Sequence, residues 1–143
     1  MNVEIQGYPS KRALVAKICG DIDHHTAKYF RGEIDKAIRN ANPLVLVLDF
    51  SEVTFMDSSG IGLVMGRYKI MSEMDGEVVV ANPPAYIRKV LQLAGIHRLT
   101  RIITDISSYT VQKNSEEEKE TSEEVAEDDK IKESDEIEAE TYK

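Results

Sequence analysis

The sequence predicts one small α/β domain, in which a mixed, mostly parallel sheet follows an N-terminal β-hairpin. Residues 2–7 and 12–19 have the composition of two short strands, and YPSK between them suits a turn. Further along the chain, apolar runs alternate with segments whose apolar residues recur every three or four positions. Strands that alternate with helices become parallel neighbours joined by right-handed crossovers. We therefore expect the helices to pack on the sheet.

The first helix is predicted from about His24 to Asn40. Asp23 directly precedes it and can accept hydrogen bonds from the free N–H groups of its first turn. One face of this helix should pack inward, because its apolar residues have spacings of three and four. These residues are Ala27, Phe30, Ile34, Ala37 and Ile38.

The next strand is predicted in LVLVLDF, a continuous apolar run typical of a strand buried on both faces. SEVTFMD should then link the end of this strand, near Phe50, to a second helix that begins near Ser58. DGE supplies turn residues at the end of that helix. The inner stripe of the second helix is expected to be Ile61, Val64, Met65 and Tyr68.

Two more strands and two more helices complete the predicted domain. VVVAN is the next strand, Asn82 can cap a third helix with a proline in its first turn, and Gly95 suits the end of that helix. LTRIIT is the last strand. Asp105 can cap a weakly amphipathic final helix that runs to about Lys113.

Charge is distributed unevenly along the 143 residues, whose formal net charge is −8. Residues 115–143 hold 14 of the 26 acidic residues and 4 of the 18 basic ones, which gives this segment −10 and leaves +2 for residues 1–114. The acidic segment has too few apolar residues to offset the entropy of ordering. We predict a domain over residues 1–113, an acidic, disordered tail over 114–143, and no direct binding of nucleic acid.

Cysteine content and hydropathy indicate the cellular compartment. Cys19 is the only cysteine, which excludes an internal disulfide and fits a reducing environment. The N-terminus has neither the basic region nor the apolar run of a signal peptide, and PLVLVL is too short to span a membrane. We expect a soluble cytoplasmic protein without membrane contact, and nothing in the sequence demands more than a monomer.

Several motifs resemble catalytic or cofactor sites only in part. DIDHHT is one residue longer than the Asp-x-Asp-x-Thr loop of aspartate-nucleophile phosphatases, and His24 and His25 point about 100° apart on a helix, unlike a zinc pair. GIGLVMG has its third glycine in the wrong place for a dinucleotide fingerprint. Asp57 is an unsuitable receiver-domain phosphoacceptor, because Thr104 stands where a lysine is needed and Asp57 lies seven residues past Phe50. We expect no metal, no cofactor and no catalytic residue.

The segment DSSGIG places hydroxyls and glycines at the start of the second helix. Ser58 can cap this helix, and a phosphate on it would meet a helix N-terminus that favours anions but also the carboxylate of Asp57. Glycine inside a helix costs about 1 kcal/mol relative to alanine. Gly60 and Gly62 therefore indicate either tight packing on the sheet or clearance for another protein.

GDIDHHTA, FMDSSGIG and GRYK occur in this order within a hairpin-then-α/β chain. Together they resemble the STAS-domain anti-sigma factor antagonists, especially the sporulation members, over about residues 1–110. The resemblance implies a STAS fold and partner switching. The unphosphorylated antagonist binds an anti-sigma factor that is also an ATP-dependent serine kinase, and so releases the sigma factor. Phosphorylation ejects the antagonist, and a serine phosphatase resets it.

Carried over residue by residue, the resemblance makes Ser58 the phosphorylation site of a protein that is not itself an enzyme. Asp21 stands where the family more often has glutamate, which keeps the charge. An alternative remains open, in which the domain is a constitutive scaffold or ligand-sensing module and Ser58 is only a cap. The partner-facing surface implied by the resemblance comprises Asp21, Asp23, His24, Asp57, Ser59, Ile61, Gly62 and Arg67.

Overall fold

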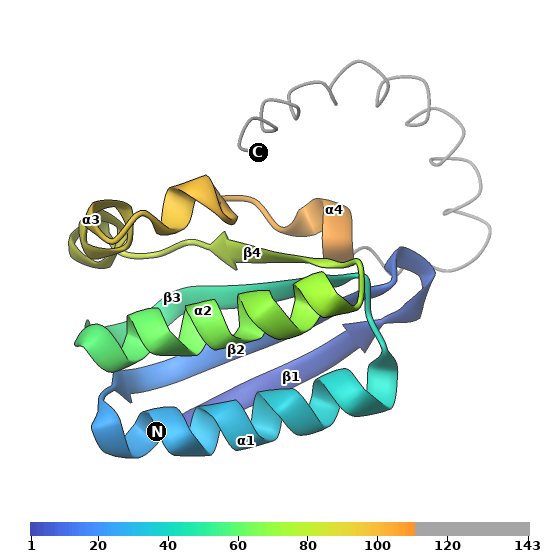
Figure 1. Cartoon of the computed structure of the whole chain (residues 1–143), viewed down its shortest axis with the longest axis horizontal. Helices are drawn as coiled ribbons and strands as arrows, with labels where there is room; N and C mark the ends of the chain where they lie inside the picture. The colour runs from blue at the N-terminus through green and yellow to red at the C-terminus, as the bar shows by residue number, and fades with distance from the viewer. Residues whose placement is uncertain (111–143) are drawn as a thin grey trace. The chain divides into compact units, whose positions relative to one another are not determined.

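The strands form one mixed sheet, in which their spatial order is the same as their order along the chain (Figure 1). The computed structural model describes residues 1–110. β1 and β2 are antiparallel, as predicted for the hairpin, and each later strand is parallel to the one before it. The predicted α/β class is confirmed. The strands are β1 (Asn2–Tyr8), β2 (Ala13–Ile22), β3 (Val45–Met56), β4 (Glu77–Ala81) and β5 (Arg101–Ile103).

Helices cover both faces of the sheet within the described part of the chain. Figure 1 shows α1 and α2 side by side across one face. α4 packs on the other face, where Ile106 and Tyr109 contact a small cluster centred on Val15, Val47 and Val79. The helices are α1 (His24–Ala41), α2 (Ser58–Glu73), α3 (Ala85–Leu93) and α4 (Ser107–Thr110), with 3-10 turns at Pro9–Lys11 and Ile96–Arg98.

The core follows from the alternation of side chains along the central strands. In β3, Leu46, Leu48 and Phe50 face α1 and α2, whereas Val47 faces the side of α4. All of these side chains are fully buried, which confirms the prediction for LVLVLDF. α1 contributes Phe30, Ile34 and Ile38 to the same core, as its spacing predicts.

β3 is longer than predicted. It runs to Met56, so most of SEVTFMD is strand rather than a link, and Asp57 follows the strand directly. The pairing of this extension with β2 contains two register shifts, between Lys17 and Cys19 and between Gly20 and Asp21. The predicted end near Phe50 was wrong because burial on both faces stops there, although the strand continues.

The inner stripe of α2 also differs from the prediction. The buried residues are Gly60, Leu63, Val64, Arg67 and Met71. Of the predicted stripe, Val64 is fully buried, Ile61 and Tyr68 are partly buried and pack against the core, and only Met65 is wrong, because it is 39% exposed. Apolar residues occur on most sides of this helix, so the apolar period alone does not fix which side faces the sheet.

The ends of the remaining helices agree with prediction except at α3. The expected cap of α3 by Asn82 was wrong, because the helix starts at Ala85 with Pro84 at its N-cap and has no side-chain cap. Asn82 instead takes a left-handed conformation, with φ of 54°. Gly95 follows α3 with φ of 80°, and Asp105 accepts from the N–H of Ser107 at 2.9 Å, as expected.

The other C-terminal predictions concern residues beyond Thr110. The final helix up to Lys113, the domain boundary there and the acidic tail over 114–143 lie outside the described residues. Among residues 1–110, no helix is long and apolar enough to cross a membrane.

Candidate functional site

The polar motifs meet where β2 and β3 end side by side. Ile22 pairs with Met56, and the N–H of Asp57 donates to the carbonyl of Ile22 at 3.2 Å. Each strand is followed at once by an aspartate and then by a helix, α1 after Asp23 and α2 after Asp57. Parallel pairing thus brings two sequence motifs that lie more than thirty residues apart to one end of the domain.

A capping box fixes the start of α1. The carboxylate of Asp23 accepts from the N–H groups of His25 at 3.0 Å and Thr26 at 2.9 Å, and the N–H of Asp23 donates to Oγ1 of Thr26 at 2.9 Å. Oγ1 of Thr26 also donates to the carbonyl of Asp21 at 2.8 Å. The hydrogen bond from the backbone of Thr26 lowers the pKa of Asp23, which therefore stays charged at neutral pH.

Asp57, not Ser58, caps α2. Its carboxylate accepts from the N–H of Ser59 at 2.8 Å, and its carbonyl accepts from the N–H of Gly60 at 2.9 Å. Ser58 is the first residue of the helix and is exposed, and its hydroxyl forms no hydrogen bond with any described residue. The reading of Ser58 as a plain cap was wrong, because the neighbouring carboxylate already holds the N–H that a cap would satisfy.

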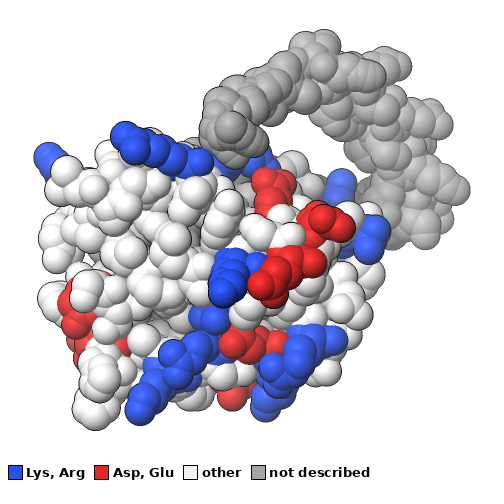
Figure 2. Space-filling model, viewed as in Figure 1, with Lys and Arg blue, Asp and Glu red and all other residues white. Residues whose placement is uncertain are grey.

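The ends of β2 and β3 form an acidic surface. Oγ1 of Thr54 donates to Oδ1 of Asp21 at 2.5 Å, which joins the two strands. Residues 18–27 and 50–66, here called the acidic end, contain four acidic residues and no lysine or arginine. Figure 2 shows acidic side chains at the end where α1 and α2 begin, beside a largely uncharged area over the first half of α2.

Arg67 does not belong to this surface. Its side chain is 5% exposed and lies between α1 and α2, where Nε is 2.9 Å from Oδ1 of Asp35. That contact is an ion pair by distance, but Nε of Arg67 and Oδ1 of Asp35 are not aligned as a hydrogen bond. The hydrogen bond between the two side chains runs from Nη2 of Arg67 to Oδ2 of Asp35, at 3.4 Å. Nη1 donates to the carbonyl of Leu63 at 3.3 Å. Burial lowers the pKa of Arg67, and the charge of Asp35 opposes this effect.

The expectation that Arg67 faces a partner is therefore corrected. GRYK resembles the family motif, but the turn of α2 that carries Arg67 faces α1, so the guanidinium is enclosed between the two helices. The structure gives this residue a different role, which is to hold α2 against α1.

The two glycines near Ser58 have different environments. A Cβ on Gly60 would overlap Cγ and Sδ of Met56, so this glycine allows α2 to pack closely on β3. A Cβ on Gly62 would meet nothing within 4 Å, and Gly62 is exposed. Clearance for another protein is therefore wrong for Gly60 and remains a prediction for Gly62.

The other predicted surface residues lie around this end of the domain. Asp21 and His24 are exposed, and Ser59 and Ile61 are partly exposed on the first turn of α2. The sequence reading missed Thr54 and Phe55, of which Phe55 is 43% exposed. The β-branched residues Val53 and Thr54 and the aromatic Phe55 were the available signals of a strand there.

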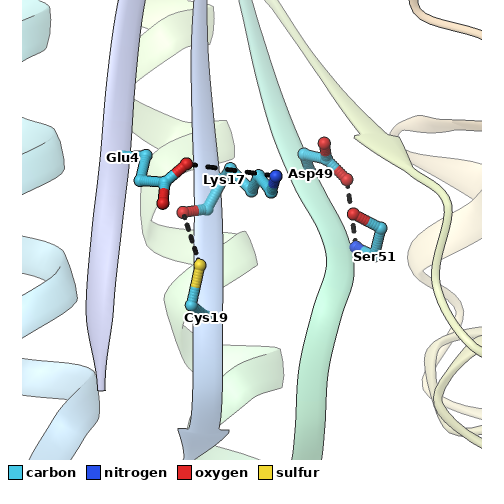
Figure 3. A network of polar contacts seen from close by, with 5 residues as sticks. All are labelled: Glu4, Lys17, Cys19, Asp49 and Ser51. Carbon is cyan, nitrogen blue, oxygen red and sulfur yellow. Dashed lines mark hydrogen bonds and ion pairs between the residues drawn. The ribbon is translucent and has the colours of Figure 1, made fainter.

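A separate polar network lies on the α4 side of the sheet, away from Ser58 (Figure 3). Nζ of Lys17 lies 3.9 Å from Glu4, and the Asp49 carboxylate accepts from the N–H of Ser51 at 3.0 Å. The Cys19 thiol donates to the carbonyl of Lys17 at 3.8 Å, and its burial, helped by the charge of Glu4, raises its pKa. The thiol is therefore held in its less reactive protonated form.

Comparisons with known proteins agree with the fold and the motifs. Residues 2–109 match the STAS domain family. An anti-sigma F factor antagonist of Paenibacillus polymyxa is 34% identical over 104 residues, which are 71% of this chain and 87% of that protein. Another, from Lysinibacillus sphaericus, is 32% identical over 61% of this chain and 74% of that protein.

Solved structures give the same result. The unphosphorylated anti-sigma factor antagonist SpoIIAA has 28% sequence identity and a TM-score of 0.64, over 75% of this chain and 92% of that one. The phosphorylated Bacillus SpoIIAA matches with a TM-score of 0.59 and the same identity, over 75% of this chain and 96% of that one. This chain therefore belongs to the STAS-domain family, among the anti-sigma factor antagonists.

Proposed function

We propose that this antagonist is a switch controlled by phosphorylation of Ser58. In its unphosphorylated form it binds an anti-sigma factor that is also a serine kinase, and so releases a sigma factor. The observation that carries the proposal is the exposed Ser58 hydroxyl at the start of α2, unbonded within the described residues because Asp57 provides the cap. A kinase can reach this hydroxyl without opening the fold.

The local chemistry supports a reversible charge switch. A phosphoserine adds nearly two negative charges at neutral pH. The N-terminus of α2 offsets part of this charge, whereas Asp57 and a nucleotide held by the kinase would repel it. The modification can therefore be accommodated by the free domain and still be unfavourable in the complex. Release of the antagonist then needs no unfolding.

The kinase-facing surface in this proposal is the acidic end around Ser58. Arg67 has no place in it, because it is buried. A serine phosphatase would return the protein to its binding form. The direct contacts we propose come from Asp21, Asp23, His24, Asp57, Ser59, Ile61 and Gly62.

The relatives favour a sporulation-type sigma factor as the target. Two relatives above 30% identity are anti-sigma F factor antagonists, whereas an anti-sigma-B factor antagonist of Listeria monocytogenes is 25% identical. We further propose that the protein acts as a cytoplasmic monomer, that it is a substrate rather than an enzyme, and that it contacts neither nucleic acid nor a membrane.

A phosphorylation experiment tests the proposal. The full chain is incubated with its anti-sigma factor kinase and ATP, and the phosphate is located by mass spectrometry. We expect one phosphate on Ser58, none on Ser58→Ala and undiminished phosphorylation of Ser59→Ala. A phosphate on another residue of the wild-type chain, or full phosphorylation of Ser58→Ala, would contradict the proposal.

Binding measurements separate the switch from a constitutive scaffold. Ser58→Glu places a carboxylate where the phosphate would stand, so it should bind the kinase more weakly than the wild type. Ser58→Ala adds no charge and should bind it as tightly as the wild type. Equal affinity of all three proteins would favour the scaffold.

A further inference from the structure

β3 has an edge without a strand partner in the described part of the chain. Its pairing with β4 stops at Asp49 and Ala81. The N–H of Asn82 then donates to the carbonyl of Ile103 at 2.8 Å, so the chain turns away from β3 toward β5. Beyond this point, Glu52–Met56 pairs only with β2. The outer side of Glu52–Met56 is here called the open edge.

The open edge is accessible and has few of the features that prevent strand pairing. Glu52, Thr54 and Phe55 are all exposed. Proline and lysine, which protect many edge strands, are absent from Glu52–Met56. The register shifts toward β2 bend this part of β3, but no described strand covers its outer side. Exposed, unpaired strand backbone is a template for an added strand.

Position and charge indicate which partner the open edge fits. Met56 is two residues before Ser58, so a segment lying along the open edge would continue toward the Ser58 hydroxyl. Glu52 is exposed and forms no ion pair within the described residues. The complementary segment is therefore extended, carries a basic side chain opposite Glu52 and covers the exposed ring of Phe55.

We propose that the anti-sigma factor kinase binds by adding an extended segment of its own backbone to the open edge. This inference rests on the proposed function, because it identifies the kinase as the occupant. Backbone hydrogen bonds would supply affinity, and the side chains of Glu52 and Phe55 would select the segment. The strand addition would hold the kinase beside Ser58 and explains why β2 and β3 continue beyond the rest of the sheet.

Hydrogen exchange of single amides, followed by NMR, tests the strand addition. In the free protein, the amides of Glu52–Met56 that point away from β2 should exchange readily. In the complex with the kinase, these amides should exchange at least about tenfold more slowly, while those bonded to β2 change little. β1, at the far edge of the sheet, is the internal control and should change less than about twofold.

Matched charge reversals give a second readout. Glu52→Arg should raise the Kd for the kinase at least about fivefold, because it reverses the charge that faces the added segment. Glu73→Arg, an exposed site at the other end of α2, should change the Kd less than about twofold. Circular dichroism of both variants checks that they are folded.

The outcomes separate this inference from the proposed function. If a complex forms and Ser58 is phosphorylated, but the outward amides of Glu52–Met56 exchange as in the free protein, the strand addition is wrong and the switch stands. Equal slowing of all amides in Glu52–Met56 would indicate simple covering and also overturn it. If no complex forms and Ser58 is not phosphorylated, both proposals fail.

Discussion

At the scale of single residues, Asp57 caps α2 and Ser58 carries the exposed hydroxyl. The start of the helix can therefore be well ordered and still be modified. A serine that caps a helix would have to exchange its hydroxyl acceptor for a phosphate oxygen when phosphorylated. Here the Asp57 carboxylate accepts from the N–H of Ser59, so a phosphate on Ser58 displaces no capping bond. The start of α2 can remain intact in both forms, and the difference between them is charge.

The glycines of α2 provide a test at this scale. Gly60→Ala should lower the free energy of unfolding by about 1–3 kcal/mol, because the added Cβ overlaps Met56. Gly62→Ala and Gly66→Ala should each raise it by about 1 kcal/mol, because a Cβ at either position meets nothing within 4 Å and alanine favours the helix. Urea unfolding measures all three.

Kinase binding then separates the two open glycines. If Gly62 provides clearance, Gly62→Ala should weaken binding although it stabilises the domain, and Gly66→Ala, one turn further on, should weaken it less. Destabilisation by Gly62→Ala would show that the helix surface is more crowded there than the structure indicates.

At the scale of elements, sequence patterns predicted the helices and strands that are buried on one or both faces. They missed the end of β3, which continues beyond its pairing with β4. LVLVLDF predicted the central part of β3 because both faces are covered there. SEVTFM was missed because the register shifts put its buried residues, Val53 and Met56, three positions apart instead of two. A strand with such a bulge has no simple period in its sequence.

The candidate site was predictable in part for the same reason. Contiguous motifs identified Asp21, Asp23 and Asp57, which the strands bring to one end of the domain. Arg67 was misplaced because its burial depends on Asp35, a residue of another helix whose proximity no local pattern reveals. Thr54 was missed because its partner Asp21 is 33 residues away in the chain.

The cap of α1 gives a pH-dependent prediction. The pKa of Asp23 is lower in the folded protein than its unfolded value of 3.8, so its stabilising effect is complete above that value and is lost as the pH falls through the folded pKa. Asp23→Asn keeps a capping side chain without the titration. It should unfold like the wild type at neutral pH and lose less stability in acid.

Urea unfolding of both proteins between about pH 6 and pH 3 measures this difference. The two curves of unfolding free energy against pH should start close together at neutral pH and separate in acid, where the wild type falls below Asp23→Asn. Parallel curves would mean that other carboxylates carry the acid sensitivity of the domain.

At the scale of the whole molecule, the folded domain holds two helix starts together at one end of the sheet. β2 and β3 deliver the starts of α1 and α2 side by side, and the Asp35–Arg67 pair joins the same helices further along. The surface around Ser58 therefore depends on contacts between β2 and β3 and between α1 and α2. Changes at the buried pair should act on stability first and on binding only through the position of α2.

A double-mutant cycle on this pair tests that view. Asp35→Ala leaves the guanidinium of Arg67 buried without its charge partner and should lower the free energy of unfolding by about 2–4 kcal/mol. Asp35→Leu combined with Arg67→Met replaces both charges with apolar groups and should cost less than Asp35→Ala alone. Glu33→Ala removes an exposed pair, in which Lys36 lies 4.0 Å away, and should cost less than about 0.5 kcal/mol.

Urea unfolding gives these free energies, and phosphorylation by the kinase gives the functional readout. The double variant should remain a substrate at Ser58, because neither charge faces the kinase when α1 and α2 stay packed. A double variant that is stable but no longer phosphorylated would return Arg67 to the partner-facing surface. Equal costs for Asp35→Ala and Glu33→Ala would show instead that water reaches the pair between the helices, because only an exposed ion pair is worth so little.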